Sequence, residues 1–204
     1  GLTYLIVPGI EKRGATETAG VVPSQGALNA SDTALSVAYA RKNAIPSLID
    51  DVDGGAAVKI IRSAIGSKSA VALAVDLGAT VRAKNGMRFA LGVQNLGTPM
   101  KFDSVSDPLP LSLRAGAAYS PLKDLTLGLT LDQYLIDQKF YASFGGEYWL
   151  RNAFALRAGY RYGYDTAHLG AMTGLSLGIG IKVNGLGLDY AYVPFGDLGD
   201  THRF

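Results

Sequence analysis

Large apolar residues alternate with small or polar ones along most of the chain, and the pattern is clearest near its end. From residue 175 to residue 183 every odd position carries an aliphatic side chain, whereas the even positions carry serine, glycine or lysine. A period of two residues is that of a β-strand, whose successive side chains point to opposite faces of a sheet. Asn184 and Gly185 tolerate the positive φ of a tight turn, and the alternation resumes beyond them. The pattern therefore predicts an antiparallel hairpin.

The same unit recurs upstream, so the sequence predicts an all-β chain. The predicted strands cover residues 2–7, 34–41, 56–61, 70–82, 87–94, 111–119, 125–131, 140–150, 154–162, 175–183 and 187–192. With a strand that begins near Thr201, these make about eleven strands and the start of a twelfth, more than the roughly five or six of a typical sheet. Residues 8–32 are rich in Gly, Pro, Ser and Thr and are predicted to form a long surface loop.

The connections between the predicted strands alternate in length. Those near residues 85, 122, 151 and 185 are short, those near 20, 103, 136, 167 and 198 are longer, and the one near 48 departs from the rule. Short turns at one end and long loops at the other are typical of transmembrane β-barrels. Several strands are also about nine to twelve residues long, which suits a tilted strand crossing a bilayer. The sequence thus predicts one antiparallel, up-and-down transmembrane β-barrel domain over residues 1–204.

Alternation alone does not show which face of the sheet is outside, so the residue types on the polar face are the evidence that distinguishes the two. The polar face consists of small residues with isolated charges of both signs, whereas a surface facing water carries lysine and glutamate more often. We therefore expect this face to line the lumen, with these polar or charged residues: Asp76, Arg114, Asp132, Glu147, Arg157, Arg161, Lys182 and Asp189. The expected lipid-facing residues are Leu73, Val75, Leu127, Leu129, Leu177 and Ile179. An aromatic girdle is expected from Tyr119, Phe140, Tyr148, Phe154, Tyr160, Tyr190 and Tyr192.

The isolated charges are placed to pair across neighbouring strands. Counted from the turns, three pairs fall opposite one another or one step apart: Arg114 with Asp132, Glu147 with Arg157, and Lys182 with Asp189. Opposite charges at such positions stabilise a sheet by about 0.2–1 kcal/mol. A structural network is therefore favoured over a substrate path. Trp149 falls on the same face as these charges and does not fit the girdle.

Composition and motifs narrow the function classes. The chain has 204 residues, a formal net charge of +2, no cysteine, and no basic run interleaved with aromatics, so nucleic acid is a poor partner. It also lacks an apolar run of about 18 residues that could form a transmembrane helix. The two histidines, His168 and His202, have no second ligand nearby, and the stretch from Asp51 to Gly54 resembles a calcium loop that carries Arg62 where the ligating Glu is needed. We expect no enzyme activity, cofactor or metal.

Four phrases of the sequence are similar to the PorV/PorQ family of bacterial outer-membrane proteins, relatives of the FadL-type barrels. They cover residues 92–97, 107–116, 156–164 and 188–203. The resemblance extends over residues 70–204 and implies an outer-membrane barrel of about fourteen strands. It also implies a choice between two roles: carrying exported cargo proteins in type IX secretion, and transport of hydrophobic solutes as in FadL relatives.

The leading expectation is therefore a non-enzymatic protein of the bacterial outer membrane that binds exported cargo proteins or components of the secretion system. Passage of hydrophobic solutes and a soluble, ligand-binding β-barrel are the alternatives. Since the chain opens and closes within predicted strands, we expect the barrel to be incomplete at both ends. The expected completion is roughly a hundred residues before Gly1 and a strand after Phe204, giving an even number of strands.

Overall fold

The computed structural model shows an all-β chain. It describes residues 2–13, 24–44, 52–83, 85–164, 166–170, 172–183, 185–195 and 199–203. Within these ranges the one helix is α1 (Thr166–Leu169), a single turn. No helix among the described residues is long and apolar enough to cross a membrane.

Twelve of the strands form one sheet whose order follows the sequence. They are β1 (Leu2–Arg13), β2 (Ser24–Arg41), β3 (Val52–Ile65), β4 (Lys68–Arg82), β5 (Arg88–Gly97), β8 (Ser112–Leu122), β9 (Leu125–Tyr134), β10 (Lys139–Leu150), β11 (Phe154–Tyr162), β12 (Leu175–Val183), β13 (Leu186–Pro194) and β14 (Asp200–Arg203). The short strands β6 (Met100–Phe102) and β7 (Val105–Asp107) form a separate antiparallel pair. The antiparallel, up-and-down arrangement is confirmed. The sheet is not closed into a barrel, because its order ends at β1 and at β14.

The predicted loop over residues 8–32 is wrong where the structure describes it. Strand β1 continues to Arg13 and β2 begins at Ser24, and β1 pairs along its length with residues 24–35 of β2. The register shifts between Val7 and Ile10, so Pro8 and Gly9 lie in an irregular step of β1. Such a step tolerates a residue without an N–H donor, which explains why turn-forming residues misled the sequence pattern. The middle of the predicted loop, residues 14–23, lies outside the described residues.

The chain divides into two compact units, and the single-domain expectation stays a prediction. Unit 1 contains Gly1–Ala40, Gly55–Leu77 and Gln94–Leu111; unit 2 contains Arg41–Gly54, Gly78–Val93 and Ser112–Phe204. Strands β2, β3, β4 and β5 each contribute residues to both units. Four of the five boundaries fall inside a continuous strand, and the fifth lies at the start of β8.

In unit 1, small side chains are buried and large ones are exposed. The alanines of β4 are buried at positions 70, 72 and 74, whereas Val71 and Leu73 between them are 56% and 52% exposed. Leu109 packs with Ala72 and Ala74, and Met100 and Ile61 of β3 pack against this cluster. The stretch from 97 to 110, predicted as a plain loop, thus contains the β6–β7 pair and contributes to a small core.

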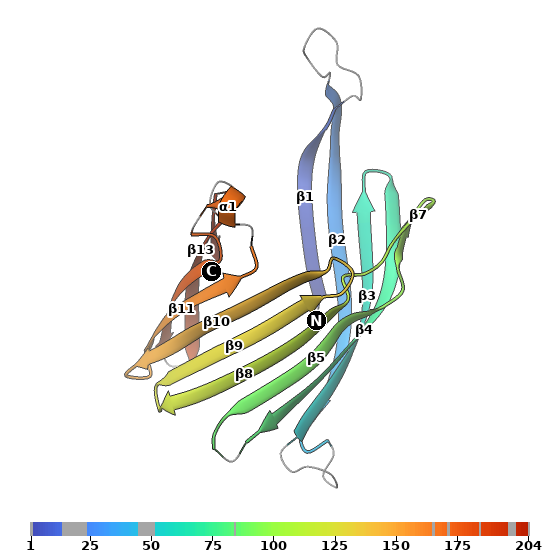
Figure 1. Cartoon of the computed structure of the whole chain (residues 1–204). Helices are drawn as coiled ribbons and strands as arrows, with labels where there is room; N and C mark the ends of the chain where they lie inside the picture. The colour runs from blue at the N-terminus through green and yellow to red at the C-terminus, as the bar shows by residue number, and fades with distance from the viewer. Residues whose placement is uncertain are drawn as a thin grey trace. The chain divides into compact units, whose positions relative to one another are not determined.

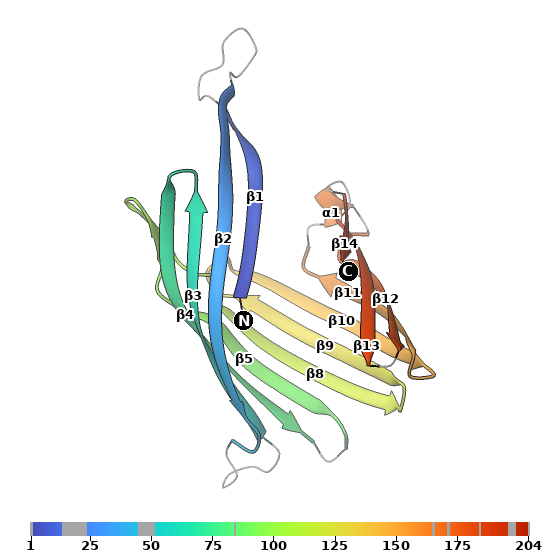
Figure 2. The same cartoon turned by 180° about the vertical axis from the view of Figure 1, so that it is seen from behind.

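Unit 2 contains a regular run of neighbouring strands. Figure 1 shows β8, β9, β10 and β11 side by side, and β12, β13 and β14 can be followed in Figure 2. Their tight turns form where the sequence predicts them. Arg151 and Asn152 both have positive φ, at 51° and 54°, and Gly185 has a φ of 83°. Positive φ at both central residues is what the tightest hairpin turns require, so the sequence sets the register of these strands.

Candidate functional site

One face of the unit 2 sheet, here called the apolar face, carries large hydrophobic side chains that are exposed. On β9 and β12 these are Leu127, Leu129, Leu131, Leu177, Ile179 and Ile181, which are between 37% and 51% exposed. The cross-strand register keeps such residues on one face, as in the direct opposition of Phe144 to Leu129. A sheet whose large side chains are exposed while its small ones are buried is inverted relative to a water-soluble protein.

The residues predicted to face lipid all lie on strand faces of this kind. Leu73, Leu127, Leu129, Leu177 and Ile179 are exposed, and Val75 is half-buried. That the covering medium is lipid stays a prediction.

The predicted aromatic residues lie on the apolar face of unit 2. Tyr119, Phe140, Tyr148 and Phe154 are exposed, and Tyr160, Tyr190 and Tyr192 are half-buried. Tyr119, Tyr148 and Phe154 lie near the short turns of their hairpins, whereas Phe140, Tyr160 and Tyr192 lie toward the opposite strand ends. Tyr190 lies in the middle of β13, so six of the seven predicted girdle residues lie toward strand ends.

The opposite face, here called the polar face, carries a buried carboxylate bound by two arginines. Asp132 of β9 is 2% exposed and lies directly opposite Arg114 of β8. Arg114 Nε donates to Oδ1 of Asp132, and Arg161 Nη2 of β11 donates to Oδ2 at 2.9 Å. The Arg161 guanidinium also stacks over the ring of Tyr141, 5.0 Å from its centroid. The predicted pairing of Arg114 with Asp132 is confirmed, and Arg161 is a partner that the prediction did not include.

A second network spans three strands of the same face. Arg157 Nε donates to Oε2 of Glu147, directly opposite it, at 2.6 Å, and Arg157 Nη1 donates to Oδ1 of Asp189 at 2.5 Å. Glu147 also accepts a hydrogen bond from Trp149 Nε1 at 2.7 Å. The predicted pair of Glu147 and Arg157 is therefore confirmed. Trp149 belongs to the polar face, as its position in the sequence indicates.

The predicted pair of Lys182 and Asp189 is wrong. Lys182 lies opposite Gly187, and Asp189 lies opposite Gly180. Asp189 reaches across β12 to Arg157 because glycine leaves the intervening position empty: a Cβ at Gly180 would lie 2.5 Å from Asp189 Oδ1. Counting residues from the turn correctly predicts that Asp189 lies on the polar face. Its partner is Arg157 because Gly180, which lies between them, has no side chain.

In unit 1 the predicted residue Asp76 belongs to a third polar cluster. Lys59 Nζ of β3 lies 2.7 Å from Asp76 Oδ1 and donates to Asn95 Oδ1 at 2.5 Å. The backbone N–H of Asn95, a residue with φ of 61°, donates to the same Asp76 oxygen at 2.8 Å. Lys59 and Asn95 were missed by the sequence reasoning. The position of Lys59 as a lone charge between Val58 and Ile60 is the signal that could have found it.

The sequence features weighed for metal binding do not assemble. Among the described residues, no three His, Cys, Asp or Glu side chains lie close enough together to hold a metal ion. Asp53 accepts a hydrogen bond from the backbone N–H of Asn43 at 3.1 Å, and Asp51 lies outside the described residues. His202 Nδ1 is 2.7 Å from the Tyr190 hydroxyl on the apolar face, and the side chain of His168 is not among those described.

Comparison with known proteins adds no family. No family model matches the chain, and no curated protein matches it at a significant level. The functional interpretation therefore depends on the two sheet faces and on the resemblance of the four sequence phrases.

Proposed function

We propose that this chain is the strand-built wall of a bacterial outer-membrane β-barrel, with the apolar face toward lipid. The observation that carries the proposal is the inverted burial of the sheet. Leucine, isoleucine and phenylalanine side chains are exposed on one face, while Asp132, Ala155 and Ser112 are buried on the other. Lipid stabilises such an apolar surface, whereas water would leave it as an unusually large hydrophobic patch.

The polar face supports the same assignment. Many of its side chains are small, and Arg114, Arg157 and Arg161 are joined to carboxylates by ion pairs, as expected of a face that lines a crowded lumen. The cavities of unit 2 include Gly116, Gly128, Gly145, Gly159 and Gly178 among their lining residues. A soluble β-barrel would instead gather its leucines and isoleucines inside.

Among the roles implied by the resemblance to PorV/PorQ, the charged polar face favours holding exported cargo proteins at the cell surface. A path for hydrophobic solutes needs a continuous apolar lining, whereas ion pairs from Arg114 to Asp189 cross the polar face from β8 to β13. Desolvating these groups would oppose the passage of an apolar molecule. In this proposal the protein is not an enzyme, and its partners are outer-membrane lipid and exported proteins.

Single-cysteine labelling tests the lipid assignment directly, because the chain contains no native cysteine. Leu129→Cys and Leu177→Cys probe the apolar face, and Thr130→Cys and Ser176→Cys are their neighbours on the polar face. In vesicles, a water-soluble maleimide is expected to label the two polar-face variants and to spare the two leucine variants. Equal labelling of both sets in folded protein would overturn the proposal.

The role is tested in the source cells by photo-crosslinking from the connections at the long-loop end, such as Asp137. Cargo holding predicts covalent adducts with exported proteins, and no increase in uptake of hydrophobic solutes by vesicles that contain the chain. Solute uptake without adducts would assign the alternative role of solute passage.

A further inference from the structure

A cavity of about 270 Å³ opens on the polar face of unit 2, toward the strand ends near α1. Its polar lining includes two arginines and two serines, and its apolar lining includes aromatic residues: Arg161, Arg203, Ser143, Ser176, Tyr164 and Phe195. Among the residues that the structure describes, none that lines this cavity carries a carboxylate. The lining of the cavity therefore combines arginine cations with aromatic rings.

Arg161, which lines this cavity, shares its carboxylate partner with a second arginine. Its carboxylate partner, Asp132, is shared with Arg114, so two guanidinium groups compete for one carboxylate. The Nε atom of Arg161 is buried and has no hydrogen-bond partner among the residues that the structure describes. An unsatisfied buried N–H on a charged group is costly, and an added acceptor would relieve that cost.

Arg203 supplies the second positive charge. It is an exposed residue of β14, opposite Ala191 of β13, and it lines this cavity and the adjoining one of about 480 Å³. The adjoining cavity contains the second network, whose carboxylates, Glu147 and Asp189, are both bound by Arg157. Hydroxyl groups of Ser143 and Ser176 provide further donors beside Arg161.

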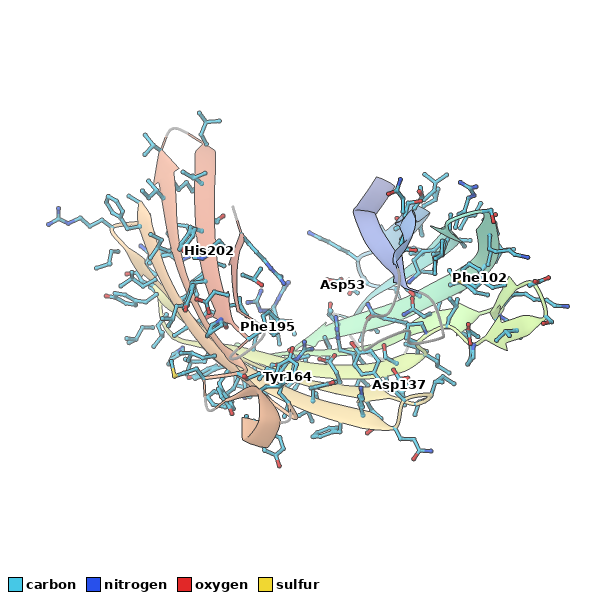
Figure 3. The ribbon with its side chains drawn as sticks, turned by 90° about the horizontal axis from the view of Figure 1, so that it is seen from above. Asp53, Phe102, Asp137, Tyr164, Phe195 and His202 are labelled. Atoms are coloured by element: carbon cyan, nitrogen blue, oxygen red, sulfur yellow. The ribbon has the colours of Figure 1, made fainter. Side chains whose placement is uncertain are left out.

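The aromatic wall is held by edge contacts. Figure 3 shows Tyr164 and Phe195 close together, and their ring centroids are 6.3 Å apart at an interplanar angle of 79°. Tyr164 also contacts Tyr141, whose ring supports Arg161. Edge-to-face packing of this kind leaves ring surface available to a flat apolar group.

We propose that this cavity binds a small organic carboxylate with a flat apolar body. Guanidinium groups bind carboxylates through paired N–H donors, and Arg161 and Arg203 are the cations of this site. The volume is below the usual range of about 300–1,000 Å³ for ligand pockets, which favours a compact ligand over a long chain. The site is internal to unit 2 and does not require the apolar face to contact lipid.

Calorimetric titration of the whole folded chain with benzoate, in a neutral detergent, tests the proposal. Saturable binding of benzoate is expected, with benzamide, its uncharged analogue, binding at least about tenfold more weakly, since a charged hydrogen bond is lost. Arg203→Gln should weaken benzoate binding by about tenfold or more for the same reason. Because Arg203 is exposed on a terminal strand, this variant is expected to fold.

Arg88→Gln is the matched control, since Arg88 lines a different cavity of unit 2 and its loss removes the same charge. Benzoate affinity should stay unchanged in this variant. Equal loss in Arg88→Gln and Arg203→Gln would show a general attraction to positive charge, and would overturn the site. So would equal binding of benzoate and benzamide, or unchanged affinity in Arg203→Gln. Equal labelling of the polar-face and leucine cysteine variants in vesicles would remove the membrane assignment. It would not change the benzoate-binding result.

Discussion

Replacing the buried carboxylate of Asp132 is expected to destabilise the protein far more than replacing either of its arginine partners. Asp132→Asn keeps the shape of the side chain but leaves Arg114 and Arg161 without a counter-charge. Arg114→Gln leaves Asp132 bound by Arg161, so the buried carboxylate keeps one cation. The two variants therefore remove the same ion pair with different consequences.

The magnitudes follow from burial. The Asp132 side chain is 3% exposed and accepts two charged hydrogen bonds, so Asp132→Asn should cost about 3–5 kcal/mol, the range for breaking a buried pair. The Arg114 side chain is 43% exposed, and solvent screening reduces its loss to about 1 kcal/mol. The double variant leaves one uncompensated arginine rather than two, and should be more stable than Asp132→Asn alone.

Urea unfolding measures these differences through the fluorescence of Trp149, the single tryptophan of the chain. The indole N–H of Trp149 donates a hydrogen bond to Glu147 on the polar face, so its fluorescence reports the unfolding of that face. All four proteins are compared in the same detergent, and an unchanged slope against denaturant shows that only stability differs. Costs that add in the double variant, or equal costs in the two single variants, would refute the shared-carboxylate reasoning.

Two further outcomes follow from the sheet faces. Gly180→Ala should destabilise the fold by about 1–3 kcal/mol, because the new Cβ would lie 2.5 Å from Asp189 Oδ1. Gly187→Ala in the same hairpin meets no atom within 4 Å, and a cost equal to that of Gly180→Ala in urea unfolding would contradict this explanation. Leu129→Arg should cost about 2–4 kcal/mol in lipid vesicles. Thr130→Arg, one residue along on the polar face, should cost clearly less, and the reverse order in unfolding from vesicles would reverse the assignment of the faces.

The proposed role depends partly on the resemblance to PorV/PorQ, whereas the predicted changes in stability do not use it. The predictions for Asp132 and Gly180 depend on contacts within unit 2 and hold for any function of the chain, whereas the prediction for Leu129 depends on the lipid assignment. Cysteine labelling tests whether lipid covers the apolar face, and cross-linking tests whether exported proteins bind. Urea unfolding tests the ion-pair networks of the polar face. If labelling and cross-linking gave the opposite of the expected results while unfolding agreed, the description of the ion-pair networks would stand and the proposed role would be wrong.

The sequence by itself determined the strands, the turns and the composition of the two faces. Strict alternation fixes which residues share a face, since a strand places every second side chain on the same side. Local turn chemistry fixes the register of a tight hairpin, as at Arg151 and Asn152, and so placed Glu147 opposite Arg157. In the β8–β9 hairpin, a register shift between Tyr119 and Leu122 also contributes to setting Arg114 opposite Asp132. These are short-range properties, which need no knowledge of the rest of the molecule.

Only the tertiary structure decided the extent of β1 and β2 and the partners of the charges. Backbone pairing extended both strands through residues that favour turns, because hydrogen bonds to a neighbouring strand outweigh local propensity. Asp189 bound Arg157 rather than Lys182, and Asp132 gained Arg161, because long side chains reach across a strand wherever an intervening side chain is missing or small. Such contacts depend on empty space between strands, which a pattern along a single strand does not encode.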